Sequence, residues 1–171
     1  RNKLLWRDES VDGIKTGYTS AAGYCLVTSA KRDEMRLVSV VLGSHSEKSR
    51  AEQTQTLLNY GFRFYETHRL YKAGEKVANV RIWKGEKEEL SIGLRRDLFV
   101  TVLRGQYKSL DAKLKIEANI VAPASRGQSK GKVMLKLGDE SLGEYPLVVL
   151  ESVAQGNLWR RFSDNIRLMF E

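Results

Sequence analysis

The sequence lacks a long apolar segment and has few of the residues that constrain a chain covalently. It contains one cysteine, Cys25, and two prolines in 171 residues. No apolar run reaches the roughly eighteen residues that a membrane-spanning helix needs, so no such span is predicted. The chain begins at Arg1 with no charged-then-apolar leader, so an export signal is either removed or part of upstream sequence.

The single cysteine excludes an intrachain disulfide. Cys25 lies in the apolar run from Tyr24 to Val27. Free cysteine behaves as a small hydrophobic residue, so we expect Cys25 to be a buried core thiol. The redox compartment stays open.

The charge is basic but spread out. Hydrophobic residues make up 42% and charged residues 29%, which favours a globular chain, and the net charge is +8. Most of the excess lies in residues 67–150, where Lys and Glu alternate freely. An ordinary soluble face explains this better than a polyanion partner. The aromatic residues are not clustered with basic ones, so no nucleic-acid partner is predicted. No cofactor or metal is predicted either.

Residues 1–66 predict a β-β-β-α unit. Strands are expected at 11–19, 23–30 and 35–42, the last nearly all apolar and therefore buried on both faces. Ser49 and Glu52 form a capping box for the helix that follows. Its apolar face is predicted to contain Ala51, Leu58 and Phe62, with Leu57 beside them.

This first unit is too small to be complete. One helix covers one face of a three-stranded sheet, and the strand pattern demands cover on both faces. Either a partner packs there or the chain has lost an N-terminal half.

Residues 70–150 predict a small all-β domain. Polar turns separate five segments that alternate or are mostly apolar. These segments are 76–83, 98–103, 112–117, 132–137 and 145–150. The boundary is expected near 67–74, so the fold class is α+β, with domains at 1–68 and 69–152 and a tail helix at 153–171.

The tail predicts an amphipathic helix over 157–171. Its apolar face is formed by Leu158, Trp159, Phe162, Ile166, Met169 and Phe170. This face either docks on the β domain or lies in a membrane interface, and periodicity alone does not decide. The terminal position and the bulky aromatics favour the membrane.

One short motif points to chemistry. Lys15-Thr16-Gly17 lies on the first predicted strand, and this tripeptide is one of three elements of the serine acyl-transfer enzymes that react with penicillin. Lys15 can stabilise negative charge, and the Thr16 hydroxyl can donate to a carboxylate. Gly17 lets an extended substrate approach the strand edge, and the Tyr18 N–H is placed to donate to an oxyanion. On the tripeptide alone, an exposed lysine and a turn glycine remain the better explanation.

The wider sequence changes that balance. It closely resembles the low-molecular-mass D-alanyl-D-alanine carboxypeptidases of the penicillin-binding protein 5 and 6 group. The resemblance is carried by the string Val11-Asp12-Gly13-Ile14-Lys15-Thr16-Gly17 and covers nearly the whole chain. Further matching stretches are 1–6, 22–24, 35–37, 40–43, 57–67, 104–106, 122–123, 146–151 and 168–170.

The resemblance implies a function. In that family, the serine of a Ser-x-x-Lys element attacks the D-Ala-D-Ala bond of peptidoglycan stem peptides, and β-lactams acylate the same serine. Lys15, Thr16 and Gly17 would bind the substrate or β-lactam, and the Tyr18 N–H would form half of the oxyanion hole. Tyr18 stands where relatives commonly have a histidine, a change that the backbone role survives.

The same resemblance assigns two arginines and a location. Arg50 matches an arginine that holds the terminal carboxylate of the substrate, and an arginine beside a positive helix N-terminus is otherwise unfavourable. Arg1 matches an arginine near the active-site mouth. The protein would lie on the periplasmic face of the bacterial inner membrane, attached through its tail.

Two other stretches match motifs of the serine acyl-transfer enzymes, and there are two alternatives to the function that the resemblance implies. The stretch 129–132 fits Ser-x-x-Lys and 163–165 fits Ser-x-Asn, but both follow Lys-Thr-Gly, one in an expected glycine-rich turn and one on the polar face of the tail helix. The nucleophile is therefore expected upstream of residue 1, and the isolated chain is expected to be inactive.

A β-lactamase is disfavoured because a long β stretch follows Lys-Thr-Gly. The alternative function is a non-catalytic module that binds cell wall or membrane.

Overall fold

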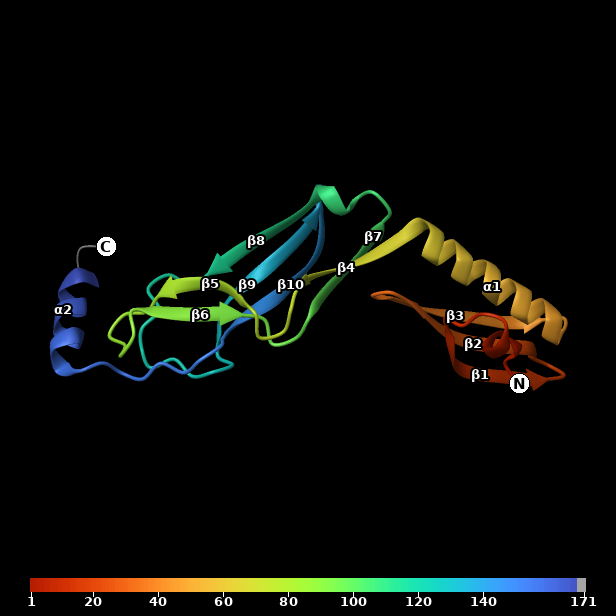
Figure 1. Cartoon of the computed structure of the whole chain (residues 1–171), viewed down its shortest axis with the longest axis horizontal. Helices are drawn as coiled ribbons and strands as arrows, with labels where there is room; N and C mark the ends of the chain where they lie inside the picture. Colours follow the sequence, from red (N-terminus) through yellow and green to blue (C-terminus); the bar gives the residue numbers. More distant parts are fainter. Residues whose placement is uncertain (169–171) are drawn as a thin grey trace. The chain divides into compact units, whose positions relative to one another are not determined.

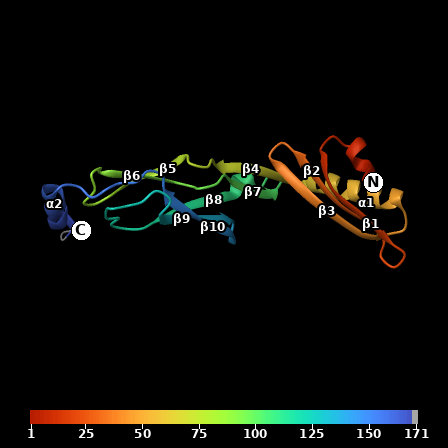
Figure 2. The same ribbon diagram turned by 90° about the horizontal axis from the view of Figure 1, so that it is seen from below.

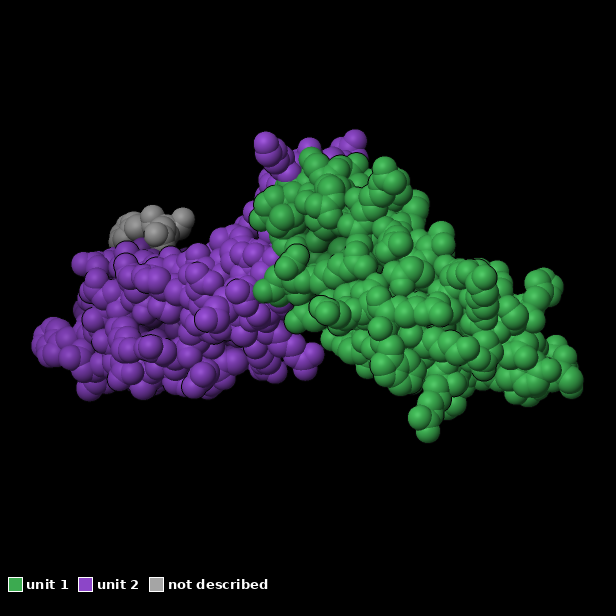
Figure 3. Space-filling model, turned by 45° about the vertical axis from the view of Figure 1, so that its right-hand side comes forward, with its two compact units in different colours: residues 1–68, 100–107 green, residues 69–99, 108–171 purple. Residues whose placement is uncertain are grey.

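The computed structural model describes residues 1–168, which form two compact units of mixed α and β structure. Unit 1 contains residues 1–68 and 100–107, and unit 2 contains residues 69–99 together with the chain from residue 108 onward. Figure 3 colours the two units separately.

Unit 1 is a three-stranded antiparallel sheet with one long helix against it. The strand order is β1-β2-β3, and α1 runs along one side of this sheet in both ribbon views (Figures 1 and 2). The elements are the 3-10 helix η1 (Lys3–Trp6), β1 (Val11–Thr19), β2 (Gly23–Arg32), β3 (Met35–Ser44) and α1 (Glu47–Phe64). The β-β-β-α order predicted for this segment is confirmed.

The sheet of unit 1 is covered on one face. Along β3, Met35, Ser39 and Val41 are buried and belong to the side that packs on α1. Alternate residues point the other way, and Val40 and Leu42 are 55% and 71% exposed. The bare face expected for this unit is therefore present, and the burial of β3 on both faces by further cover stays a prediction.

The start of α1 differs from its prediction. Ser46 is the N-cap, and its side chain accepts a hydrogen bond from the Ser49 N–H at 3.0 Å. The N-cap therefore lies three residues before Ser49, and the predicted Ser49–Glu52 capping box is wrong. Two serines with this spacing each fit the N-cap pattern, and the sequence alone did not identify which one is used.

Two paired strands contain residues of both units. β4 (Tyr65–Tyr71) follows α1 directly and pairs with β7 (Leu98–Leu103). The Arg104 guanidinium donates to the carbonyl oxygens of Phe62, Arg63 and Tyr65, at 3.0, 3.2 and 3.3 Å. These bonds satisfy carbonyls that the end of a helix leaves without partners.

Unit 2 is built on a five-stranded antiparallel sheet in the order β5-β6-β10-β9-β8. Its strands are β5 (Lys76–Arg81), β6 (Glu89–Gly93), β8 (Leu110–Ile116), β9 (Ser129–Leu137) and β10 (Glu140–Val149), with the 3-10 helix η2 (Tyr107–Ser109) before β8. The sequence did not predict β4 and β6. It also placed residues 129–132 in a turn, but they begin β9.

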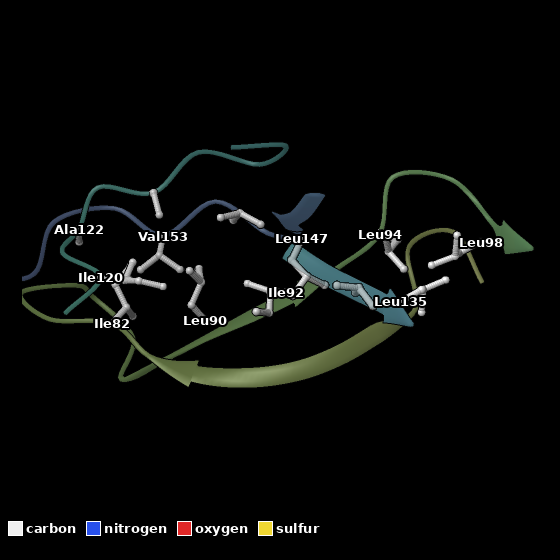
Figure 4. Packing of buried hydrophobic residues seen from close by; sticks show 13 residues of the cluster. Ile82, Leu90, Ile92, Leu94, Leu98, Ile120, Ala122, Leu135, Leu147 and Val153 are labelled. Carbon is white, nitrogen blue, oxygen red and sulfur yellow. The ribbon is translucent and has the colours of Figure 1, made fainter. Parts of the chain in front are cut away.

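The core of unit 2 is aliphatic. Leu90, Ile92, Val133, Leu135 and Leu147 have no exposed surface. Figure 4 shows side chains of this cluster meeting between the strands. Alternation along each strand places these residues on one face.

The last element that the structure describes is helix α2 (Leu158–Leu168). Met169 and Phe170, which the sequence assigned to the apolar face of the tail, lie outside the described residues. Among residues 1–168 no helix combines the length and the apolar character that crossing a membrane would need.

Candidate active site

The Lys-Thr-Gly motif lies on β1, an edge strand of the unit 1 sheet. β2 pairs with β1 on one side only, so the other edge of β1 has no strand beside it among the described residues. Lys15 and Gly17 are exposed and Thr16 is half-buried. The Lys15 ammonium donates to the Thr16 carbonyl oxygen at 2.6 Å. An exposed lysine, a hydroxyl and a bare backbone thus lie together on one strand.

Gly17 has no packing reason to be glycine. A Cβ added at this position would meet only the Cβ of Cys25 at 3.7 Å, an ordinary van der Waals contact. The missing side chain therefore leaves space at the open edge of β1 and relieves no clash. Such an edge suits an extended peptide that pairs with the strand.

Tyr18 directly follows the motif. Its ring packs against Tyr24 of β2 with 4.4 Å between centroids, and the side chain remains exposed. The ring is thus held on β2, while the backbone of Tyr18 belongs to the edge strand. This arrangement is compatible with a role for the Tyr18 N–H and gives the side chain a packing role.

Arg50 is buried under the motif. It lies in the first turn of α1, and the residue is only 4% exposed. Its Nη1 donates to the carbonyl oxygens of Gly17 at 3.1 Å and Cys25 at 3.2 Å, and Glu47 lies 3.5 Å from its Nη2. The guanidinium therefore links α1 to β1 and β2. The simple alternative of an exposed arginine at the helix start is wrong.

The environment of Cys25 corrects the predicted core thiol. Cys25 is only half-buried, although its neighbour Leu26 is fully buried. Cys25 pairs with Gly17 across β1 and β2. Because glycine has no side chain to cover its cross-strand partner, the thiol keeps access to solvent.

The N-terminal residues are anchored to β1 by Asn2. Its side-chain amide donates to the Gly13 carbonyl oxygen at 3.2 Å, and its carbonyl oxygen accepts from the Leu4 N–H at 3.1 Å. Asn2 is buried, whereas the neighbouring Arg1 is exposed. Asn2 was not predicted, and its only signal in the sequence is an Asn two residues before a short apolar run.

Asp8 is a second structural residue that sequence analysis missed. Its carboxylate accepts hydrogen bonds from Ser10 and from the Gln55 side chain at 2.8 Å, and Arg32 forms an ion pair with it at 3.1 Å. These partners, with the Ser10 bond the most important, lower the pKa of Asp8 to about 2. Asp8 thereby joins the turn before β1 to α1 and β2.

Neither of the stretches that match Ser-x-x-Lys and Ser-x-Asn resembles a nucleophile site. Ser129 begins β9, and its hydroxyl donates to the Gly131 carbonyl oxygen at 3.3 Å. Ser163 lies on α2 and donates to the Arg160 carbonyl oxygen at 3.1 Å. Both belong to unit 2, whereas Lys15 belongs to unit 1. Across residues 1–168, no three His, Cys, Asp or Glu side chains are grouped to hold a metal ion.

Comparison with known proteins identifies the family. Residues 65–155 match the family described as penicillin-binding protein 5, C-terminal domain, and residues 1–46 match the family described as D-alanyl-D-alanine carboxypeptidase. The chain belongs to the penicillin-binding protein 5 family. The resemblance inferred from the sequence is therefore confirmed.

Curated relatives agree with this family assignment. D-alanyl-D-alanine carboxypeptidase DacA of Escherichia coli K12 is 39% identical over 172 aligned residues, and DacC of the same strain is 40% identical. Each alignment covers 99% of this chain and 43% of the relative. The chain thus spans less than half the length of these relatives.

Solved structures of the penicillin-binding protein 5 family have the same fold. Penicillin-binding protein 5 from Haemophilus influenzae matches with a TM-score of 0.81 and 36% identity, covering 90% of this chain and 46% of that chain. The carboxypeptidase DacD from Francisella tularensis matches with a TM-score of 0.60 and 35% identity, covering 91% of this chain and 39% of that chain.

Proposed function

We propose that this chain supplies the Lys-Thr-Gly side of a serine D-alanyl-D-alanine carboxypeptidase, which removes the terminal D-alanine from peptidoglycan stem peptides and is acylated by β-lactams. The observation that carries the proposal is the open edge of β1. Lys15, Thr16 and Gly17 pair with β2 on one side of β1, and no strand lies on the other side among the described residues. Membership of the family supports the reaction class.

Each residue of the motif has a role in this proposal. The substrate lies extended along β1, and Gly17 allows its backbone to approach. The Lys15 ammonium and the Thr16 hydroxyl attract the substrate carboxylate and stabilise charge during acyl transfer. The Tyr18 N–H donates to the oxyanion of the tetrahedral intermediate. Water then hydrolyses the acyl-enzyme.

Arg50 has a different part in the proposal. Its contacts with the Gly17 and Cys25 carbonyl oxygens support a role in holding the motif strand in place. Nη1 makes both of these contacts and Nη2 lies 3.5 Å from Glu47, so a substrate carboxylate would have to reach the remaining N–H donors of a residue that is only 4% exposed. Arg1, exposed beside the anchored Asn2, would lie at the mouth of the site.

The nucleophile comes from an upstream portion of the same protein in this proposal. The exposed apolar face of β3, with Val38, Val40 and Leu42, is the surface on which that portion would pack. Exposed apolar patches of this kind mark interaction surfaces. Covering this face would complete the two-sided sheet.

Replacing Lys15 by alanine in the intact protein tests the assignment. Loss of the ammonium removes charge stabilisation in the transition state, so acylation by a penicillin should slow by roughly a hundredfold or more. The exposed Lys48 of α1 provides the control, and Lys48→Ala should acylate at the parent rate. Stopped-flow acylation of folded Lys15→Ala at an unchanged rate would leave the motif without a catalytic role.

The tail suggests a membrane-surface role for the same protein. Leu158 and Trp159 of α2 are 78% and 83% exposed, and Phe162 and Ile166 are exposed beside them. An exposed apolar helix face supports contact with the lipid interface, with Arg side chains toward the headgroups. We place the protein peripherally on the periplasmic face of the inner membrane.

A vesicle sedimentation assay distinguishes a tail that binds lipid from one that does not. Removing residues 157–171 should abolish binding to phosphatidylglycerol-containing vesicles, and Trp159→Ser should weaken it because an interfacial anchor is lost. Lys136→Ser, an exposed change on β9, should bind as the parent does. Equal binding with and without the tail would contradict membrane attachment through α2.

A further inference from the structure

Helix α2 contacts the rest of unit 2 through its polar side. An amphipathic helix on a globular domain normally buries its apolar stripe against the core. Here Asp164 is 6% exposed and is the buried residue of α2, whereas the apolar residues Leu158, Trp159 and Phe162 are exposed. Something other than apolar burial must hold the helix in this orientation.

The strongest contact is made by Asp164. Its Oδ2 accepts a hydrogen bond at 2.6 Å from the backbone N–H of Lys84, in the loop between β5 and β6. Lys84 has a φ of 57°, a conformation that few residues other than glycine adopt. Hydrogen bonds to a carboxylate are stronger than neutral ones, and a buried carboxylate without its donor is unfavourable. Arg160 and Glu88 form an ion pair at 3.2 Å nearby, but Glu88 is largely exposed, which weakens its effect.

The chain that leads into α2 is fixed on the same loop. The Gly156 N–H donates to the Lys84 carbonyl oxygen at 2.8 Å, and the Glu86 N–H donates to the Ala154 carbonyl oxygen at 2.9 Å. A Cβ at position 156 would lie 2.7 Å from the Gly85 carbonyl oxygen, so only glycine allows this close approach. Residues 154–156 therefore fix where the helix starts, and Asp164 fixes how it is rotated.

We propose that Asp164 is a latch that holds α2 in one orientation on the β domain, with the apolar face pointing outward. The latch acts before any lipid is present and is kept when the helix meets a lipid surface, a step that rests on the membrane role proposed above. Without the latch, α2 would turn on its backbone attachment and bury Leu158 and Trp159 against protein. Asp164 is thus a positioning residue for the membrane-facing side.

Distances between two spin labels test the latch in the 171-residue chain. One label is attached at Arg161→Cys on α2 and the other at Asp139→Cys in the exposed turn between β9 and β10, with Cys25→Ser as background. The parent should give one narrow distance peak, in solution and on vesicles of phosphatidylethanolamine and phosphatidylglycerol. Asp164→Ala should lose this peak, with the circular dichroism of the β strands unchanged.

Two variants of the helix make the outcome specific. Asn165→Ala, the matched control at the next and exposed position, should keep the narrow peak. Asp164→Asn keeps a side-chain oxygen as acceptor for the Lys84 N–H and should keep it also. A narrow peak in Asp164→Ala would overturn the latch, as would broadening of the parent peak when vesicles bind. If the latch-dependent peak persists in solution but vesicles do not bind, the latch stands and the membrane role fails.

Discussion

Asp8 and Arg50 show how single side chains shape unit 1 around the motif strand. Asp8 joins the turn before β1 to α1 and β2, and Arg50 joins the first turn of α1 to the carbonyl oxygens of Gly17 and Cys25. Neither contact is visible in the sequence, because each connects residues far apart along the chain. The place of Lys15 and Gly17 together on one strand was predictable, since they belong to a contiguous motif.

The low pKa of Asp8 predicts a pH dependence of stability. A lowered folded-state pKa stabilises unit 1 above the unfolded value near 3.8, and this contribution is lost as pH falls toward about 2. The side chain is only 13% exposed, so we expect a contribution of about 2 kcal/mol. Asp8→Asn should lower the free energy of unfolding at pH 7 by about this amount, with little difference at pH 2.

The free energy of unfolding of unit 1 can be measured at each pH by urea titration, with amide hydrogen exchange in β1–β3 as the readout. Asp33→Asn, in the exposed turn between β2 and β3, is the control and should keep the parent pH profile. An Asp8→Asn variant as stable as the parent at pH 7 would show that its three partners contribute nothing.

At the scale of elements, helices and strands with a strong local sequence pattern could be predicted, and those with a weak pattern could not. β1, β2, β3 and α1 follow apolar alternation and helical periodicity, and their order is as predicted. β4 was missed because Tyr65–Tyr71 is half-buried along most of its length and shows no clear alternation. The five-residue β6 directly follows a charged turn. The pattern of α2 identified its apolar face, but an acid such as Asp164 on the polar face gave no sign of docking.

The β5–β6 pairing depends on a close backbone approach at Gly93. A Cβ there would lie 2.2 Å from the Glu75 carbonyl oxygen and 3.1 Å from the Leu150 side chain. Because the nearest atom is backbone, Gly93→Ala should destabilise unit 2 by about 3 kcal/mol. Thermal unfolding followed by circular dichroism measures the loss.

Gly138→Ala is a suitable comparison for that change. Gly138 has a φ of 58° but open space around it, so alanine there should cost only about 1 kcal/mol of backbone strain. Equal effects of the two substitutions would mean that the sheet shifts to accept a side chain at Gly93.

At the scale of the whole molecule, unit 1 carries a motif strand with an open edge and a sheet with an uncovered apolar face. Both features are expected if an upstream portion completes the domain, and the chain spans 43% of DacA from Escherichia coli. The bare face was predictable from the count of strands and helices alone. How an upstream portion would pack on this face was not predictable from these residues.

Covalent labelling by a fluorescent penicillin tests the central claim most directly. We expect no labelled band for the isolated 171-residue chain, because the serine that is acylated is proposed to come from the upstream portion. The intact protein that includes the upstream portion should be labelled, and hydroxylamine should release the label from its serine ester. Labelling of the isolated chain, or an unlabelled intact protein, would contradict the account.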